Sequence, residues 1–187
     1  MPRGNLFILS GPAGAGKGTL RKILFREMPG LVFSVSCTTR ERRAGETEGL
    51  DYYYISRGEF EKMIERDEFL EWAEVHGNCY GTRKKDVERV LDEGRDVLLE
   101  IDVQGCRLVK ARMPGAIRIF ITASSLDELE NRLEERGTES RAQLDVRLRN
   151  AAMEMRHARE YDHIIVNDAL PRASEELIET VKRYKKT

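Results

Sequence analysis

The chain has 187 residues, which suits one globular domain with a substantial core and room for small inserted subdomains. Its 32 Lys and Arg nearly balance its 33 Asp and Glu, so no overall charge favours nucleic acid or an anionic membrane. No apolar run approaches the roughly 20 residues of a membrane helix. No signal-peptide pattern opens the sequence, and we expect a cytoplasmic protein that binds neither membranes nor nucleic acid.

The stretch from Leu6 to Leu20 reads LFILSGPAGAGKGTL, which predicts a strand, a glycine-rich loop and the start of a helix. Gly11, Gly14 and Gly16 would let the backbone approach a ligand closely. Successive N–H groups of such a loop point at an anion, so a phosphate would fit there.

Gly11, Gly16 and Lys17 satisfy the pattern GxxxxGK of a phosphate-binding P-loop, in which the Lys serves the outer phosphates of a nucleotide. Gly18 stands where Ser or Thr is usual, so Thr19 becomes the candidate hydroxyl for Mg²⁺. The alternative is an ordinary glycine-rich turn.

The spacing of apolar residues, with Gly and Pro at the boundaries, predicts the helices and strands of the rest of the chain. We expect helices at 17–28, from Ser56, near 87–91, at 103–112, from Ser125, at 141–159 and through Leu177 and Tyr184, and strands at 31–35, within 69–82, at 96–101, 116–122 and 162–166. Ser56 and Ser125 each begin a capping box, S-x-x-E. After Ser125, the residues Leu126, Leu129 and Leu133 are expected on one face of a helix. Five apolar strands alternating with helices predict an α/β fold with a parallel sheet, whose ligands lie at the carboxyl ends of the strands.

Two further patterns have weaker meaning. His76 and Cys79 form an isolated HxxC, for which metal ligation competes with ordinary packing, because no second pair accompanies it. The three cysteines lack CxxC spacing and suggest neither a disulfide framework nor a zinc site.

Six stretches together resemble guanylate kinase, in order and spacing, across nearly the whole chain. They are SGPAGAGKGTL, FSVSCTTRERRAGETEGLDYYY, FLEWAEVHGNCYGT, LLEIDVQG, RLEERGTES and IIVND. The resemblance implies a nucleoside-monophosphate kinase of purine metabolism that transfers the γ-phosphoryl group of ATP to GMP or dGMP and requires Mg²⁺. It also implies a P-loop NTPase fold whose five-stranded parallel core (1–37 and 84–187) carries a lid at about 134–145 and an inserted GMP-binding lobe at 38–83.

The resemblance further implies roles for single residues on the donor side. The ATP-binding residues would be Gly11, Pro12, Ala13, Gly14, Ala15, Gly16, Lys17, Gly18, Thr19 and, near the adenine, Asn167. The catalytic residues would be Lys17, Arg43, Arg132, Arg136 and Arg147. These are cations, as expected for a transition state with charge on its equatorial oxygens. For Arg132 the alternative is a helix-surface ion pair with Glu128, four residues earlier.

On the acceptor side, the residues implied to hold the GMP phosphate are Arg40, Arg43, Tyr52 and Tyr80. The residues implied to contact guanine are Ser36, Glu71, Thr82 and Asp102, where the two carboxylates accept from N1–H and N2–H₂. Glu71 could instead be an exposed strand acid beside Trp72. Glu100 would lie near the metal or steer an Arg.

One position departs from the family pattern TTRxPRxGE, because Arg42 replaces the Pro. The change removes a restraint on φ and adds charge beside the acceptor site. Two other functions stay open at this point. A guanylate-kinase-like binding module would recognise phosphorylated peptides without turnover, and another P-loop kinase would act on adenylate or a phosphorylated sugar.

Overall fold

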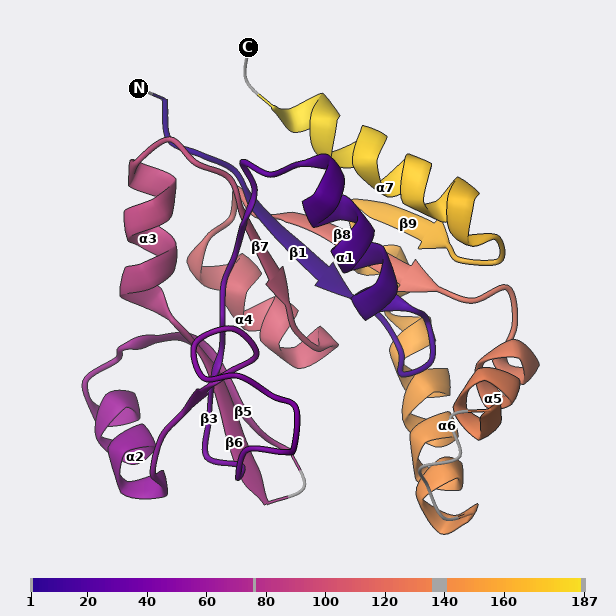
Figure 1. Ribbon diagram of the computed structural model, residues 1–187, viewed down its shortest axis with the longest axis horizontal. Coiled ribbons are helices and arrows are strands. Elements are labelled where there is room, and N and C mark those ends of the chain that lie inside the picture. The colour runs from indigo at the N-terminus through magenta and orange to yellow at the C-terminus, as the bar shows by residue number, and fades with distance from the viewer. Residues whose placement is uncertain (1, 76, 136–140, 186–187) are drawn as a thin grey trace. The chain divides into compact units, whose positions relative to one another are not determined.

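A computed structural model describes residues 2–75, 77–135 and 141–185 (Figure 1). The chain forms two compact units, one of residues 1–6, 31–99 and 104–116, the other of residues 7–30, 100–103 and 117–187. A five-stranded sheet contains, in this order, β2 (Val32–Phe33), β7 (Val97–Glu100), β1 (Leu6–Ser10), β8 (Ile117–Thr122) and β9 (His163–Val166). β2 runs parallel to β7, and β8 runs parallel to both β1 and β9. The predicted α/β class with a five-stranded parallel sheet is confirmed.

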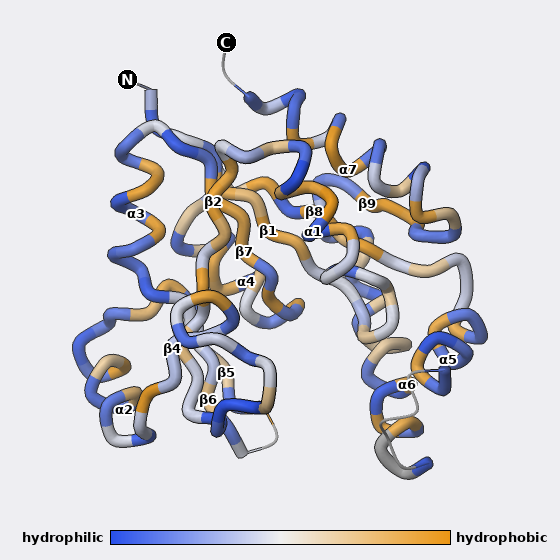
Figure 2. The backbone as a smooth tube through the Cα atoms, viewed as in Figure 1, coloured by the Kyte–Doolittle hydropathy of each residue, from blue (hydrophilic) through white to orange (hydrophobic). Residues whose placement is uncertain are grey.

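β1 and β8 are apolar because both of their faces are covered. All five residues of β1 are buried, and Phe7, Ile8 and Leu9 are fully so. β1 pairs in register with β8, where Phe7 lies opposite Ile117. Figure 2 shows the hydrophobic residues along both strands. Continuous apolar runs of this kind are typical of parallel strands between helices.

The helices of the second unit are α1 (Lys17–Glu27), α5 (Leu126–Glu135), α6 (Arg141–Arg156) and α7 (Leu170–Tyr184), with a 3₁₀ turn at Ala158–Glu160. α7 packs beside α1 and β9 (Figure 1). It buries Ala173, Leu177 and Val181, one apolar stripe at a spacing of four residues.

One sequence expectation in this unit needs correction. Of the three leucines expected on one face of α5, Leu129 and Leu133 are buried, and Leu126, the first residue of the helix, is 41% exposed. The helix expected to reach residue 159 ends at Arg156, and the 3₁₀ turn follows.

The first unit adds a four-stranded sheet in the order β4 (Tyr53–Tyr54), β3 (Cys37–Thr38), β6 (Asn78–Arg83) and β5 (Phe69–Val75). Its helices are α2 (Arg57–Glu65), α3 (Lys84–Asp92) and most of α4 (Val103–Arg112). Phe60 of α2 stacks on Phe69 of β5, with ring centroids 4.3 Å apart. The hydroxyl of Ser56 accepts a hydrogen bond from the Glu59 N–H at 3.2 Å, so the predicted cap of this helix is confirmed.

Among the described residues, no helix has both the length and the apolar character needed to cross a bilayer. The three cysteines are buried as free thiols. Burial raises the pKa of Cys37 to about 11. That thiol therefore stays protonated at neutral pH and packs as an apolar side chain.

Candidate functional site

The turn between β1 and α1 has the backbone of a phosphate-binding loop. Gly11, Gly14 and Gly16 adopt φ values of 138°, 84° and 86°. A Cβ at Gly11 would collide with the main-chain oxygen of Ile121, so only glycine fits there. Gly16 is the N-cap of α1, and the first turn of that helix contains no acidic residue. The N-terminus of α1 therefore keeps the positive end of its dipole for an anion.

The side chain of Lys17 lies over this loop. Its Nζ donates to the carbonyl oxygens of Gly11 at 2.5 Å and Pro12 at 3.1 Å. At Gly18 no atom lies within 4 Å of the point where a Cβ would stand. Thr19 is exposed on the first turn of α1, and its N–H donates to the Gly16 carbonyl at 3.1 Å. The nine residues expected to bind ATP, 11–19, thus form one continuous segment, made of the glycine-rich loop and the first three residues of α1.

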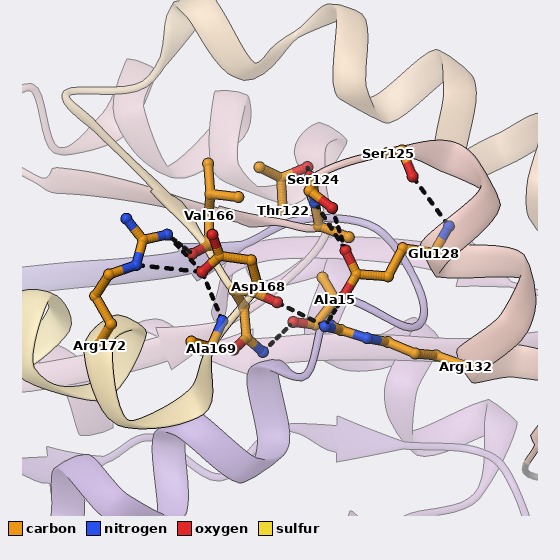
Figure 3. Close-up of polar contacts among 12 residues, drawn as sticks. Ala15, Thr122, Ser124, Ser125, Glu128, Arg132, Val166, Asp168, Ala169 and Arg172 are labelled. Carbon is orange, nitrogen blue, oxygen red and sulfur yellow. Dashed lines mark hydrogen bonds and ion pairs between the residues drawn. The ribbon is translucent and has the colours of Figure 1, made fainter.

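Asn167, which follows β9, ties the loop to α5. Its side-chain Nδ2 donates to the Ala15 carbonyl at 2.8 Å, and its own carbonyl accepts from Arg132 Nη2 at 2.7 Å. Arg132 also pairs with Glu128, which in turn accepts from the Ser124 hydroxyl (Figure 3). Arg132 therefore makes the expected helix ion pair and, in addition, a contact with the segment that supports the loop.

Ser10, the last residue of β1, fixes the segment that contains Asp102. Its hydroxyl donates to the Ile101 carbonyl at 2.7 Å, and the Ile101 N–H donates to the Leu9 carbonyl at 3.2 Å. Glu100 pairs with Arg21 of α1 at 3.0 Å, so it holds an arginine one helical turn beyond Lys17.

Two charged residues of α6, Glu154 and Arg147, belong to the second unit together with the glycine-rich loop. Burial raises the pKa of Glu154, and among the charges that act on it are Lys17, which lowers it, and Asp102, which raises it. Arg147 is half-buried and stands seven residues before Glu154, on the same face of the helix. Sequence reasoning missed Glu154, since its position on a long helix gave no signal. Arg136 lies outside the described residues, as do residues 137–140 of the expected lid.

In the first unit, Glu46 organises the arginines expected to bind a phosphate. It accepts from Arg40 Nη2 at 2.7 Å, from the Arg43 N–H at 2.8 Å and from the Tyr54 hydroxyl at 2.8 Å. The Arg40 guanidinium, followed by the Arg43 N–H, lowers the pKa of Glu46 to about 2. The same hydrogen bond raises the pKa of Arg40. Sequence reasoning missed Glu46 as a site residue, although the pattern TTRxPRxGE contains it.

Two tyrosines extend this cluster. The rings of Tyr52 and Tyr80 meet edge to face, with centroids 5.8 Å apart. The guanidinium carbon of Arg40 lies 5.4 Å from the centroid of the Tyr52 ring. Arg40, Tyr52 and Tyr80, all expected to hold one phosphate, are therefore brought together. The Arg43 side chain is exposed at the edge of the cluster.

Glu71 and Thr82 form a buried polar pair on adjacent strands. Glu71 is only 7% exposed, and its Oε1 accepts a 2.6 Å hydrogen bond from the Thr82 hydroxyl. The reading of Glu71 as an exposed strand acid is therefore excluded. Ser36 is half-buried just before β3, and its carbonyl accepts from the Tyr53 N–H at 2.9 Å.

Side chains that could together bind a metal ion do not cluster in the described part of the chain. Within residues 2–75, 77–135 and 141–185, no three His, Cys, Asp or Glu side chains gather to hold an ion. Mg²⁺ usually keeps several waters and binds through one or two protein groups together with substrate phosphates. A single hydroxyl such as that of Thr19, exposed on the first turn of α1, is compatible with that mode of binding.

A parallel α/β sheet with a glycine-rich loop, a loop lysine and a helix N-terminus defines a P-loop nucleotide-binding protein. The comparison with known families makes the class specific, since the family model for guanylate kinase matches residues 3–184. The chain belongs to the guanylate kinase family and is a nucleoside-monophosphate kinase.

Individual relatives agree with this assignment. The guanylate kinase of Desulfitobacterium hafniense (strain Y51) is 50% identical over 174 residues, which cover 93% of this chain and 87% of the relative. That of Dechloromonas aromatica (strain RCB) is 49% identical over 179 residues, or 96% of this chain and 89% of the relative. The crystal structure of guanylate kinase from Anaplasma phagocytophilum aligns with a TM-score of 0.81 at 34% identity, covering 100% of this chain and 89% of the other.

Proposed function

We propose that this protein transfers the γ-phosphoryl group of ATP to GMP, and also to dGMP, giving ADP and GDP or dGDP. A phosphate oxygen of GMP forms the new bond to the γ-phosphorus as the bond to the β–γ bridging oxygen breaks, and that oxygen leaves with ADP. The acceptor phosphate has a second pKa near about 6 and is already largely a dianion, so the step needs no strong general base.

The donor half consists of the loop at residues 11–19 and the cations around it. The loop N–H groups hold the ATP phosphates, and Lys17 neutralises the outer ones and the charge that develops during transfer. Arg132, Arg136 and Arg147 clamp the transferring group. Because one Nδ2 hydrogen of Asn167 is donated to Ala15, a contact between Asn167 and the adenine would use Oδ1 or the second Nδ2 hydrogen.

Mg²⁺ is proposed to bind at Thr19, together with the ATP phosphates. When bound, the ion would supply positive charge that neutralises the transferring phosphates. Thr19 and the glycines orient the phosphates.

The acceptor half recognises both ends of GMP. Arg40, Arg43, Tyr52 and Tyr80 bind its phosphate, and Glu46 keeps Arg40 in place by the 2.7 Å ion pair. Ser36, Glu71, Thr82 and Asp102 bind guanine. A buried carboxylate accepts from the N–H donors of guanine, whereas adenine would leave it unpaired, so the wrong base is rejected.

The buried pair of Glu71 and Thr82 carries the proposal, because a carboxylate that is 7% exposed and already holds a hydroxyl is built to recognise hydrogen-bond donors.

We also infer from the resemblance that residues 38–83 form the acceptor lobe, that residues 1–37 and 84–187 form the core, and that residues 134–145 form the lid. The protein would work in the cytoplasm.

The test is turnover of GMP with Mg-ATP, with ADP and GDP quantified separately. We expect one ADP for each GDP. Folded protein that forms neither product would support the binding-module alternative and refute the proposal.

A further inference from the structure

Strand β5, which contains Glu71, is irregular at its start. Phe69 lies opposite Arg83 of β6, but Glu71 lies opposite Thr82, so the register shifts by one residue between them. Without the shift, Glu71 would lie opposite Gly81. Because opposite residues share a face, the shift is what sets the Glu71 carboxylate beside the Thr82 hydroxyl.

Aromatic contacts along the strand agree with the bulge. Phe69, Leu70 and Glu71 are buried in succession. Phe69 and Trp72, three residues apart, both contact the ring of Phe60, at centroid distances of 4.3 Å and 6.4 Å. Phe69 and Trp72 therefore share a face across the bulge.

Arg112, at the end of α4, binds the bulge. Its Nη1 donates to the Phe69 carbonyl at 2.5 Å, and its Nη2 pairs with Asp67 at 2.9 Å. A bulge interrupts the regular hydrogen bonds between two strands. Here the Phe69 carbonyl accepts a hydrogen bond from the side chain of Arg112, 43 residues later in the sequence.

Asp67 occupies a position where the backbone favours glycine. It follows α2 with a φ of 51°, and the N–H groups of Asp67 and Glu68 bond back to Ile64 and Met63, as in a Schellman helix end. Glycine would fit this backbone, so the role of Asp67 lies in its carboxylate. That carboxylate binds Arg112, and the hydrogen bond from Arg112 is the main reason that the pKa of Asp67 is lowered.

We propose that Arg112 is a positioning residue for base selectivity, which holds the bulge of β5 and thereby keeps Glu71 in register with Thr82. The inference rests on the proposed function, in which Glu71 recognises guanine. Arg112 itself touches no substrate in this account. Its loss should therefore weaken recognition of the base and leave the phosphoryl-transfer step unchanged.

Arg112→Met retains most of the apolar stem and removes both the charge and the hydrogen bonds. We expect KM for GMP to rise about 10-fold and the preference for GMP over IMP, which lacks the 2-amino group, to fall, because small misplacements of a binding group are costly. kcat should stay within about 2-fold. Arg112→Lys, which retains a cation for Asp67, should recover part of the loss. Arg89→Met, which removes an exposed arginine paired with Glu93, is the matched control and should change neither parameter.

A double-mutant cycle with Glu71→Gln gives the decisive result. If Arg112 acts through Glu71, adding Arg112→Met to Glu71→Gln should raise KM no further. An unchanged KM in Arg112→Met, or an equal rise in both backgrounds, would overturn the positioning role alone. An unchanged KM in Glu71→Gln would instead overturn the assignment of Glu71, and this inference with it.

Unfolding midpoints of each variant distinguish a rise in KM caused by lost stability from one caused by misplacement of Glu71. Asp67→Gly supplies a second variant that should fold, since glycine suits a positive φ. It removes the ionic partner of Arg112 and leaves the bond to Phe69, so a smaller rise in KM for GMP is expected. No rise in a folded Asp67→Gly protein would contradict the part assigned to Asp67.

Discussion

The side-chain amide of Asn167 donates a 2.8 Å hydrogen bond to the main-chain carbonyl of Ala15, across 152 positions of sequence. Asn167 is buried, and its own carbonyl accepts from Arg132. One residue thus contacts both the loop proposed to hold ATP and an arginine proposed to act on the transferring group. A side chain from outside the glycine-rich loop thus binds the main chain of that loop.

Asn167→Ala should therefore loosen the loop. We expect a stability loss of about 1–3 kcal/mol, because a buried carbonyl loses its donor. We expect kcat/KM for ATP to fall by about 10-fold or more, because the loop N–H groups lose their orientation. Urea unfolding and kinetics at varied ATP measure the two effects, with exposed Asn150→Ala as the control. Wild-type ATP kinetics in the variant would contradict the supporting role.

Lys17→Ala should lower kcat by about 10²–10³-fold, because Lys17 is proposed to stabilise charge that develops in the transition state. Binding of GMP should change much less, since the acceptor half does not contain Lys17. Single-turnover rates and equilibrium titration with GMP separate the two. Lys22→Ala, an exposed lysine on the same helix, should behave as wild type. A kcat within about 2-fold of wild type in Lys17→Ala would refute the role.

The lowered pKa of Glu46 predicts that the free energy of unfolding decreases in acid. Its pKa is about 2 in the folded protein against an ordinary 4.5, so its stabilising contribution is present above about pH 4.5 and is lost between about pH 4.5 and 2. Glu46→Gln should be less stable than wild type at pH 7, and the difference should shrink towards pH 2. Urea midpoints at several pH values check this, with exposed Glu65→Gln as the control. A difference that does not depend on pH would contradict the lowered pKa.

Local patterns were enough to predict most of the fold. The GxxxxGK loop, the cap at Ser56 and the apolar runs of β1, β7 and β8 each depend on residues that are close in sequence. The helix at Val103–Arg112 was predicted with its observed bounds. The α/β class and the parallel sheet followed from these elements.

Long-range contacts could not be predicted in the same way. Arg112 bonds to the bulge in β5, and Asn167, which the resemblance had placed near the adenine, bonds to the glycine-rich loop. Both are hydrogen bonds to main-chain carbonyls, and no side-chain pattern marks such an acceptor. Burial of Glu71 also depends on strands that meet only in the fold, so the sequence left its exposure open.

The most direct test of the proposed selectivity is kcat/KM for GMP, AMP, CMP and UMP, measured with saturating Mg-ATP on the same protein preparation. The buried Glu71–Thr82 pair predicts that GMP exceeds every other acceptor by about 10⁴-fold or more, because a site built for the N1–H and N2–H₂ donors of guanine rejects bases whose edge arranges donors and acceptors differently. Comparable turnover of AMP, or a preference for any other nucleotide over GMP, would contradict it.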